Sequence, residues 1–168
     1  MYMRTQLFAT LVAVPLCGCA GSDGGDTDPS VVYGILDTEI FLFDQNLVGQ
    51  PTGAQDLTVD CPLGGTVHLT GTTTSDIQAT VDLTYDFAGC ASSGSGYDLA
   101  LTGAVFLSGS FDSTGYKALS SISDSLGVIG SVDSGDVDDT CALAVTDRGE
   151  SGQASVVSGQ WCGRDVEF

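Results

Sequence analysis

A strict alternation of apolar and polar residues over residues 77–87 is the feature that most constrains the fold of this chain. The odd positions from Ile77 to Phe87 are all apolar, and the even positions from Gln78 to Asp86 are all polar. A period of two places one face of a strand on a core and the other face in water. The pattern is typical of antiparallel sheets with one wet face, whereas strands of parallel sheets are continuously apolar.

Shorter alternating stretches cover residues 57–61, 97–107, 141–145 and 154–161, with Gly, Ser and Asp between them. Turn residues at such spacing predict successive short strands joined by hairpins. We therefore expect a mainly β protein, an antiparallel meander that forms a small barrel or sandwich.

The region 112–139 is harder to interpret. Residues 116–122 and 126–132 are predicted as two strands on either side of a turn at 123–125. A helix over residues 116–123 is an alternative, although serine is a poor helix former.

A weak internal repeat relates residues 65–71 (GTVHLTG) to residues 103–109 (GAVFLSG), with four of seven positions identical. The repeat indicates either duplicated hairpins or two strands with similar structural requirements. Two copies are too few for a solenoid.

One helix is predicted over residues 29–48, where it would cap one end or face of the sheet. Asp28 is a suitable N-cap, Pro29 suits the first helical position and Gly49 can end the helix. The β propensity of residues 40–43 argues for a strand instead. The apolar positions at helical spacing are Val32, Leu36, Ile40, Phe43 and Leu47.

Four cysteines lie in the body of the chain, and export would place them where thiols pair as disulfides. Among the three possible connectivities, spacing favours Cys61 with Cys90 and Cys141 with Cys162, because each pair brackets a segment with turn residues at its centre. A zinc site is the rival interpretation, but no C-x2-C pair is present.

The first pair carries a register problem. Pairing residue 61 with residue 90 makes odd positions face even ones, yet the apolar residues of both arms are odd-numbered. A one-residue shift resolves this, and Gly64-Gly65 is suited to a bulge or a tight turn.

The first 18 residues have the form of a secretory signal peptide, with Arg4 before an apolar run over residues 7–16 that is too short to span a bilayer. Residues 16–19 (LCGC) resemble the bacterial lipobox, which implies that Cys19 is lipidated and becomes the new N-terminus. The following Ala20 implies sorting to the outer membrane. Ordinary signal-peptidase cleavage after Ala20 is the alternative.

Residues 19–28 then form a lipidated flexible tether of about 20–30 Å, and residues 29–168 form a single β-rich domain. The segment Cys61-Pro62-x-Gly64-Gly65, followed by predicted strands, resembles uncharacterised β-rich bacterial lipoproteins. That resemblance implies a lipoprotein and no particular activity.

The charge balance excludes one class of partner. The chain has 22 acidic and 4 basic residues, a formal charge of −18, and loss of Arg4 with the leader makes it −19. Binding to nucleic acid needs clustered Lys and Arg, so no nucleic acid is expected. The aspartate excess suits either a saline habitat or a surface that binds cations or a cationic partner, and it should repel an anionic membrane.

Candidates for catalysis are few. His68 is the only histidine and lies on the polar face of its strand, with no nucleophile motif in the sequence. Asp82 and Asp86 share a polar face, but pairs of carboxylates arise by chance in so acidic a chain.

An acidic turn is the candidate metal site. Carboxylate oxygens suit Ca²⁺, although the spacing differs from that of an EF-hand loop and a solvated acidic loop is the alternative. The possible ligands are Asp133, Asp136, Asp138 and Asp139.

Tyr97, Tyr116 and Trp161 could line a carbohydrate or small-ligand surface, but the position of Trp161 beside Cys162 favours packing around a disulfide. We expect a non-enzymatic lipoprotein, anchored in the outer membrane by its lipid and binding an unknown protein or glycan partner. It would need no cofactor. Alternatives are a Ca²⁺-dependent adhesion or glycan-binding module and, less favoured, a hydrolase.

Overall fold

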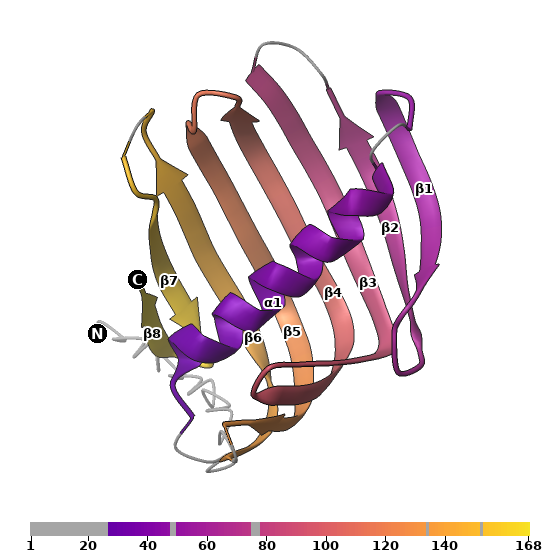
Figure 1. Cartoon of the computed structure of the whole chain (residues 1–168), viewed down its shortest axis with the longest axis vertical. Helices are drawn as coiled ribbons and strands as arrows, with labels where there is room; N and C mark the ends of the chain where they lie inside the picture. The colour runs from indigo at the N-terminus through magenta and orange to yellow at the C-terminus, as the bar shows by residue number, and fades with distance from the viewer. Residues whose placement is uncertain (1–26, 48–49, 75–77, 134, 152) are drawn as a thin grey trace, which may run out of the picture.

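The computed structural model describes residues 27–47, 50–74, 78–133, 135–151 and 153–168. It has one helix, α1 (Pro29–Asp44), a short 3-10 helix, η1 (Gln45–Leu47), and one antiparallel sheet whose strands pair in chain order (Figure 1). The strands are β1 (Gly53–Asp60), β2 (Thr66–Thr73), β3 (Gln78–Gly94), β4 (Tyr97–Asp112), β5 (Lys117–Val132), β6 (Gly135–Gly149), β7 (Val156–Trp161) and β8 (Arg164–Glu167).

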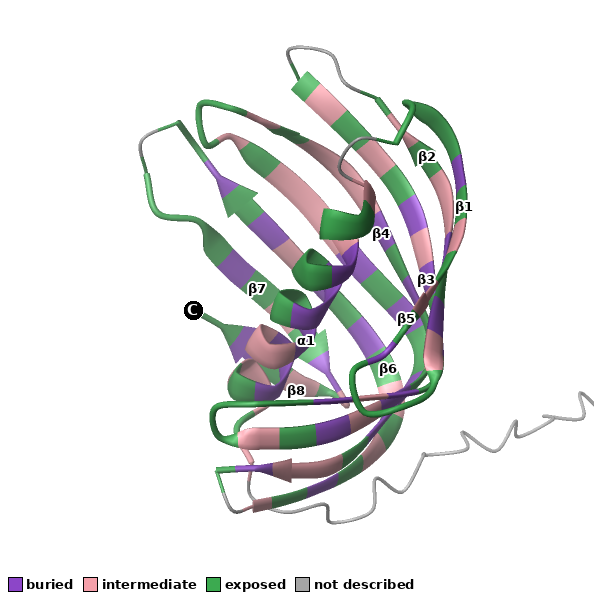
Figure 2. Ribbon diagram, turned by 45° about the vertical axis from the view of Figure 1, so that its right-hand side comes forward, coloured by how far each residue is buried: buried purple, intermediate pink, exposed green. Residues whose placement is uncertain are grey.

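The sheet is strongly curved, and α1 lies across its concave face (Figures 1 and 2). The predicted antiparallel meander with an N-terminal helix and two disulfides is confirmed. Within the described part of the chain the sheet stays open, because β1 and β8 lie at opposite ends of the strand order. The helix takes the place that a second sheet would fill in a sandwich.

Helix α1 begins where the sequence indicates. The Asp28 carboxylate accepts a hydrogen bond from the Ser30 backbone nitrogen (2.9 Å), and Pro29 fills the first turn, where its missing N–H costs nothing. The helix ends at Asp44 and continues as η1, while the predicted terminator Gly49 lies outside the described residues. The residues of α1 that face the sheet are Val32, Tyr33, Leu36, Glu39, Ile40 and Phe43.

The alternation predicted for β3 is confirmed, since Leu83, Tyr85 and Phe87 are buried beneath α1. Between β2 and β3, Val67 is opposite Phe87 and Leu69 is opposite Tyr85, so odd residues face odd residues. The apolar side chains of both strands therefore meet on one face.

The one-residue shift that Cys61 and Cys90 require lies on β3. The pairing of β3 with β4 breaks between Ala88 and Cys90, leaving Gly89 as the extra residue. The tight turn predicted at Gly64-Gly65 is confirmed and connects β1 to β2, with the Cys61 amide bonded to the Gly65 carbonyl oxygen at 3.1 Å.

Both predicted disulfides form, and each joins the open end of a hairpin. Cys61–Cys90 flanks the β2–β3 hairpin, and Cys141–Cys162 flanks the β6–β7 hairpin. Each crosslink lowers the entropy of the unfolded chain by closing a loop, at about 3 kcal/mol in the chain-entropy model.

The prediction of two strands in residues 116–132 is wrong, as is the alternative helix over 116–123. The segment is one long strand, β5, whose pairing with β6 shifts between Ser123 and Leu126. The pairing of β4 with β5 shifts between Thr102 and Phe106. These two irregularities bend the sheet without ending the strand. Residues 123–125 have the composition of a turn, but they form the bulge at which β5 bends.

The internal repeat corresponds to a shared backbone geometry. Gly71 and Gly109, the last residues of the two copies, have φ angles of 133° and 137°. A Cβ atom on either would lie 2.0 Å from a carbonyl oxygen of the neighbouring strand. Only glycine fits at these close approaches, where curvature brings adjacent backbones together.

Candidate functional site

Three tyrosine hydroxyls tie α1 to the concave face of the sheet. Tyr97 donates a hydrogen bond of 2.6 Å to Glu39 Oε1, and Tyr85 donates to Asp44 Oδ1. Tyr33, on the helix itself, donates to Ser121 Oγ on β5 at 3.4 Å. These polar contacts orient the helix along the sheet, because apolar packing by itself is not directional.

The environment shifts the pKa values of these groups. The hydrogen bond to Glu39 raises the pKa of Tyr97 to about 12, and desolvation raises that of Tyr33 to about 12. Desolvation raises the pKa of Asp44 to about 6, although the hydrogen bond from Tyr85 opposes the shift. Burial likewise raises the pKa of Tyr85.

The space between α1 and the sheet is almost completely filled. The residual cavity measures ≈ 10 Å³, about the size needed for one water. It is lined by Leu36, Glu39 and Trp161 among others, and Trp161 is only 2% exposed. Trp161 is therefore part of the core, and this cavity has no room for a substrate.

A charged group lies at the flank of the helix–sheet contact. Lys117 Nζ lies 3.2 Å from Asp147 Oδ2, whereas Oδ1 of the buried Asp147 has no partner among the described residues. Desolvation and the nearby negative charge of Asp147 raise the pKa of Asp37 on α1, and Lys117 opposes the shift. The ion pair balances part of the negative charge that this side of the helix brings toward β5 and β6.

The side of α1 that faces away from the sheet is also apolar. With 100° between successive residues, seven residues fall within a strip about 120° wide, which we call the outward stripe. No member of the stripe is charged. Val31, Phe41 and Leu42 are exposed, whereas Ile35 is half-buried at the edge of the stripe and also packs against the core. The outward stripe consists of Val31, Gly34, Ile35, Thr38, Phe41, Leu42 and Gln45.

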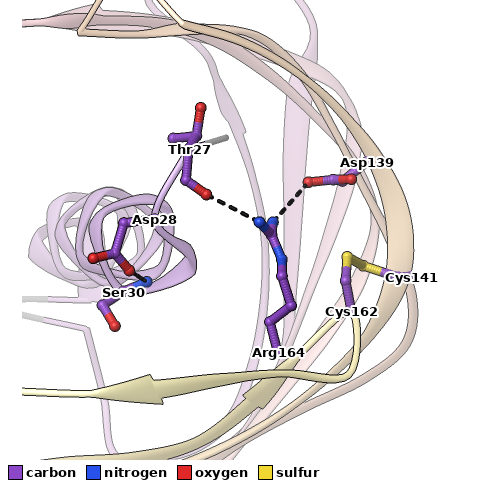
Figure 3. A network of polar contacts seen from close by, with 7 residues as sticks. All are labelled: Thr27, Asp28, Ser30, Asp139, Cys141, Cys162 and Arg164. Atoms are coloured by element: carbon purple, nitrogen blue, oxygen red, sulfur yellow. Dashed lines mark hydrogen bonds and ion pairs between the residues drawn. A yellow bond between two sulfur atoms is a disulfide. The ribbon is translucent and has the colours of Figure 1, made fainter. Parts of the chain in front are cut away.

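The start of the helix is held against the C-terminal strands. Arg164 donates a hydrogen bond from Nη1 to the Thr27 carbonyl oxygen (3.1 Å) and places Nη2 3.4 Å from Asp139 Oδ2 (Figure 3). The Glu167 amide also donates to Ser30 Oγ at 3.2 Å. Arg164 thus links the start of the helix to β6 and β8.

The four aspartates of the candidate calcium site are divided by the sheet. Asp133 lies in the β5–β6 turn, and Asp136 and Asp138 are exposed on β6 on the side opposite the core. Asp139 alternates to the concave side and pairs with Arg164. In the described ranges no group of three or more acidic, His or Cys side chains is placed to hold a metal. The calcium hypothesis stays a prediction, without a formed cluster to support it.

The other sequence candidates lie on the outer face. His68 Nε2 lies 2.8 Å from Asp56 Oδ1, with both side chains exposed. The predicted position of His68 on the polar face is therefore confirmed. Asp82 and Asp86 are exposed on the same face of β3. These groups lack the burial that tunes catalytic acids and bases.

A second surface feature is an open groove of ≈ 670 Å³ at the ends of β5, β6 and β7. Tyr116, Arg148, Glu150 and Gln153 are among its lining residues. Tyr116 is half-buried there, whereas Tyr97 is held by Glu39, so the three aromatic residues considered as a ligand surface do not come together.

The predicted leader and the predicted lipid-bearing Cys19 lie outside the described residues. Of the helices in the described ranges, none has the length and apolar character needed to cross a membrane. Comparisons with family models, curated proteins and solved structures find no match for this chain. Its class is thus defined by fold alone: an open, curved antiparallel sheet filled by its own N-terminal helix.

The outward stripe is the feature that the sequence analysis missed. Its signal was present, because Val31, Ile35, Thr38 and Leu42 recur at steps of four, three and four, parallel to the series from Val32. The apolar series from Val32 predicts only the face that packs on the sheet.

Proposed function

We propose that this protein is an exported lipoprotein, anchored in the outer membrane through Cys19, that acts as a non-enzymatic interaction module for a protein partner. The observation that carries the proposal is the filling of the concave face by α1. The cavity of ≈ 10 Å³ beneath α1 is far below the roughly 300–1,000 Å³ of typical ligand pockets, and the groove of ≈ 670 Å³ at the ends of β5, β6 and β7 is open to the surface. Recognition is then left to the surface, where the outward stripe is the main exposed apolar feature of the helix.

Two further observations support the anchored state. Both disulfides suit an oxidising compartment outside the cytoplasm. Arg164 holds Thr27 at the surface, and the eight residues from Cys19 to Asp26 can then extend at most about 30 Å. A body of this size would remain close to the membrane while keeping room to bind a partner.

The test is fractionation of cells that express the full chain, its Cys19→Ala variant and, as the matched control, its Cys17→Ala variant. We expect Cys19→Ala to move the protein to the soluble exported fraction and to abolish incorporation of labelled fatty acid. Cys17→Ala should behave as the parent. Membrane retention of the exported Cys19→Ala protein would show that the anchor is elsewhere.

A further inference from the structure

We propose that the outward stripe of α1 is a docking surface for a basic amphipathic helix of a partner protein. This inference rests on the proposed function, because it names the partner class of the same interaction module. It depends on three properties of the described residues: exposure of the stripe, its relief, and the charge around it.

The exposure of the stripe is unusual for a surface helix. An amphipathic helix normally has one apolar face on the core and a charged face in water. Here Phe41 is 61%, Leu42 52% and Val31 42% exposed, on the side opposite the buried residues. Contiguous exposed apolar side chains of this kind mark interaction sites in soluble proteins.

The surface shape of the stripe is suited to packing against another helix. Gly34 and Thr38 are small residues one turn apart, with Val31 and Ile35 at one end and Phe41 beyond them. A Cβ atom added to Gly34 would meet nothing within 4 Å, so a low point lies open between bulkier side chains. Side chains of a second helix can enter such grooves, and the 16 residues of α1 give about 24 Å for contact.

Charge decides between possible occupants. Asp37 is exposed and follows one edge of the stripe, whereas the Asp44 carboxylate is turned to Tyr85, and the whole chain carries a formal charge of −18. Two of the basic residues, Lys117 and Arg164, are engaged in ion pairs. A second copy or an anionic bilayer would bring like charges together, whereas a basic partner would be attracted and steered. An apolar helix face flanked by Lys or Arg is therefore complementary to the stripe, to Asp37 beside it and to the acidic chain as a whole.

The experiment uses the exported Cys19→Ala full chain, so that a lipid anchor does not complicate the binding measurement. The probe is a fluorescent 16-residue peptide with Leu at helical positions i, i+3, i+4 and i+7 and Lys elsewhere. Its dissociation constant is measured by fluorescence anisotropy near physiological ionic strength. We expect saturable binding that the double substitution Phe41→Ser, Leu42→Ser weakens at least about tenfold.

The matched control is Ile129→Ser, which removes an exposed side chain (57%) from the outer face of β5. It should leave the dissociation constant unchanged. Because all three substituted side chains are largely exposed, the variants should fold, and circular dichroism of each confirms it. Equal weakening by Ile129→Ser would overturn the assignment of binding to the stripe.

Two peptide controls separate apolar docking from general charge attraction. A peptide with the same Lys positions and Ser in place of Leu should bind much more weakly. Equal binding of this peptide would show that the acidic surface alone attracts cations and would overturn the proposal. A peptide with Glu in place of Lys should not bind, and equal binding of it would overturn the argument from charge.

The test also covers the two other possible occupants of the stripe, a second copy of the chain and a lipid bilayer. Sedimentation velocity over a range of salt should show a monomer, and flotation with phosphatidylcholine vesicles should show no binding. A dimer, or vesicle binding, that Phe41→Ser, Leu42→Ser abolishes would assign the stripe to a second copy or to lipid and overturn the proposal. These results are independent of the anchor, since fractionation of the Cys19 variant tests the lipid alone.

Discussion

The two faces of helix α1 are both largely apolar, but one is buried against the sheet and the other is exposed to water. Leu36 on the inner face is 2% exposed and packs on the sheet, whereas Leu42 on the outward stripe is 52% exposed. The outward stripe has no charged residue, and of the three carboxylates of α1 one, Glu39, is buried against the sheet. The carboxylate is tolerated inside because Tyr97 donates to it. The comparison teaches that α1 has two contact faces, of which the sheet covers one.

The largest expected effect comes from the inner face. Leu36→Ala should lower the free energy of unfolding by about 3 kcal/mol, because a fully buried Leu is replaced and a cavity remains. Urea unfolding with the disulfides intact measures the change. A loss below about 1 kcal/mol would mean that the helix does not depend on the sheet, and the contrast between its faces would disappear.

The next effect concerns the buried carboxylate. Tyr97→Phe should cost about 2 kcal/mol, because Glu39 loses its donor while it is 4% exposed. Tyr116→Phe removes the hydroxyl of a half-buried tyrosine away from α1 and serves as the matched control. Adding Glu39→Leu to Tyr97→Phe should restore part of the lost stability, since the orphaned carboxylate is then removed. Equal costs of Tyr97→Phe and Tyr116→Phe would argue against this role.

A smaller effect is expected from pH at the end of the helix. Because the pKa of Asp44 is about 6 in the folded protein and near 4 when unfolded, the folded state binds this proton more tightly. The contribution of Asp44 to stability is therefore highest below pH 4 and is lost as pH rises through 6.

Asp44→Asn tests this contribution, because it mimics the protonated carboxyl and keeps an acceptor for Tyr85. At pH 7.5 the variant should be more stable than the parent by about 1–2 kcal/mol, allowing for screening of a half-buried group. The difference should vanish near pH 3.5, as followed by thermal unfolding across the range. A difference that does not change with pH would contradict the shifted pKa.

The smallest effect is expected on the outward stripe. Leu42→Ala should change the free energy of unfolding by less than about 0.5 kcal/mol, since this side chain is largely exposed in the isolated protein. Urea unfolding alongside Leu36→Ala gives the direct contrast within one helix. A cost similar to that of Leu36→Ala would show that something covers the stripe even in the isolated protein, and it would remove the free surface that docking needs.

Much of the fold could be predicted because its signals are local. The alternation in residues 77–87 needs only the period of a strand, and Asp28-Pro29 marks the start of α1 by capping chemistry. Strand β5 could not be predicted in the same way. Residues 123–125 look like a turn, but the neighbouring strands carry the chain through them as a bulge. Strand β8 was also missed, because four residues are too few to show a period.

The candidate site was less accessible to prediction. The spacing of Asp133, Asp136, Asp138 and Asp139 brings them together in the sequence, but the pleat of β6 sends Asp139 to the other side of the sheet. The pairing of Glu39 with Tyr97 joins residues 58 positions apart, so no local pattern contains it.

By itself the sequence determined the strand periodicity, the helix start, the pairing of the cysteines and the negative charge, because these follow from local geometry, spacing and composition. Only the tertiary structure decided which apolar face of α1 is covered. The curved sheet has one concave side and can bury a single arc of the helix. The opposite arc, which is uncharged and largely apolar, is left exposed to water, and that exposure is the basis of the proposed docking surface.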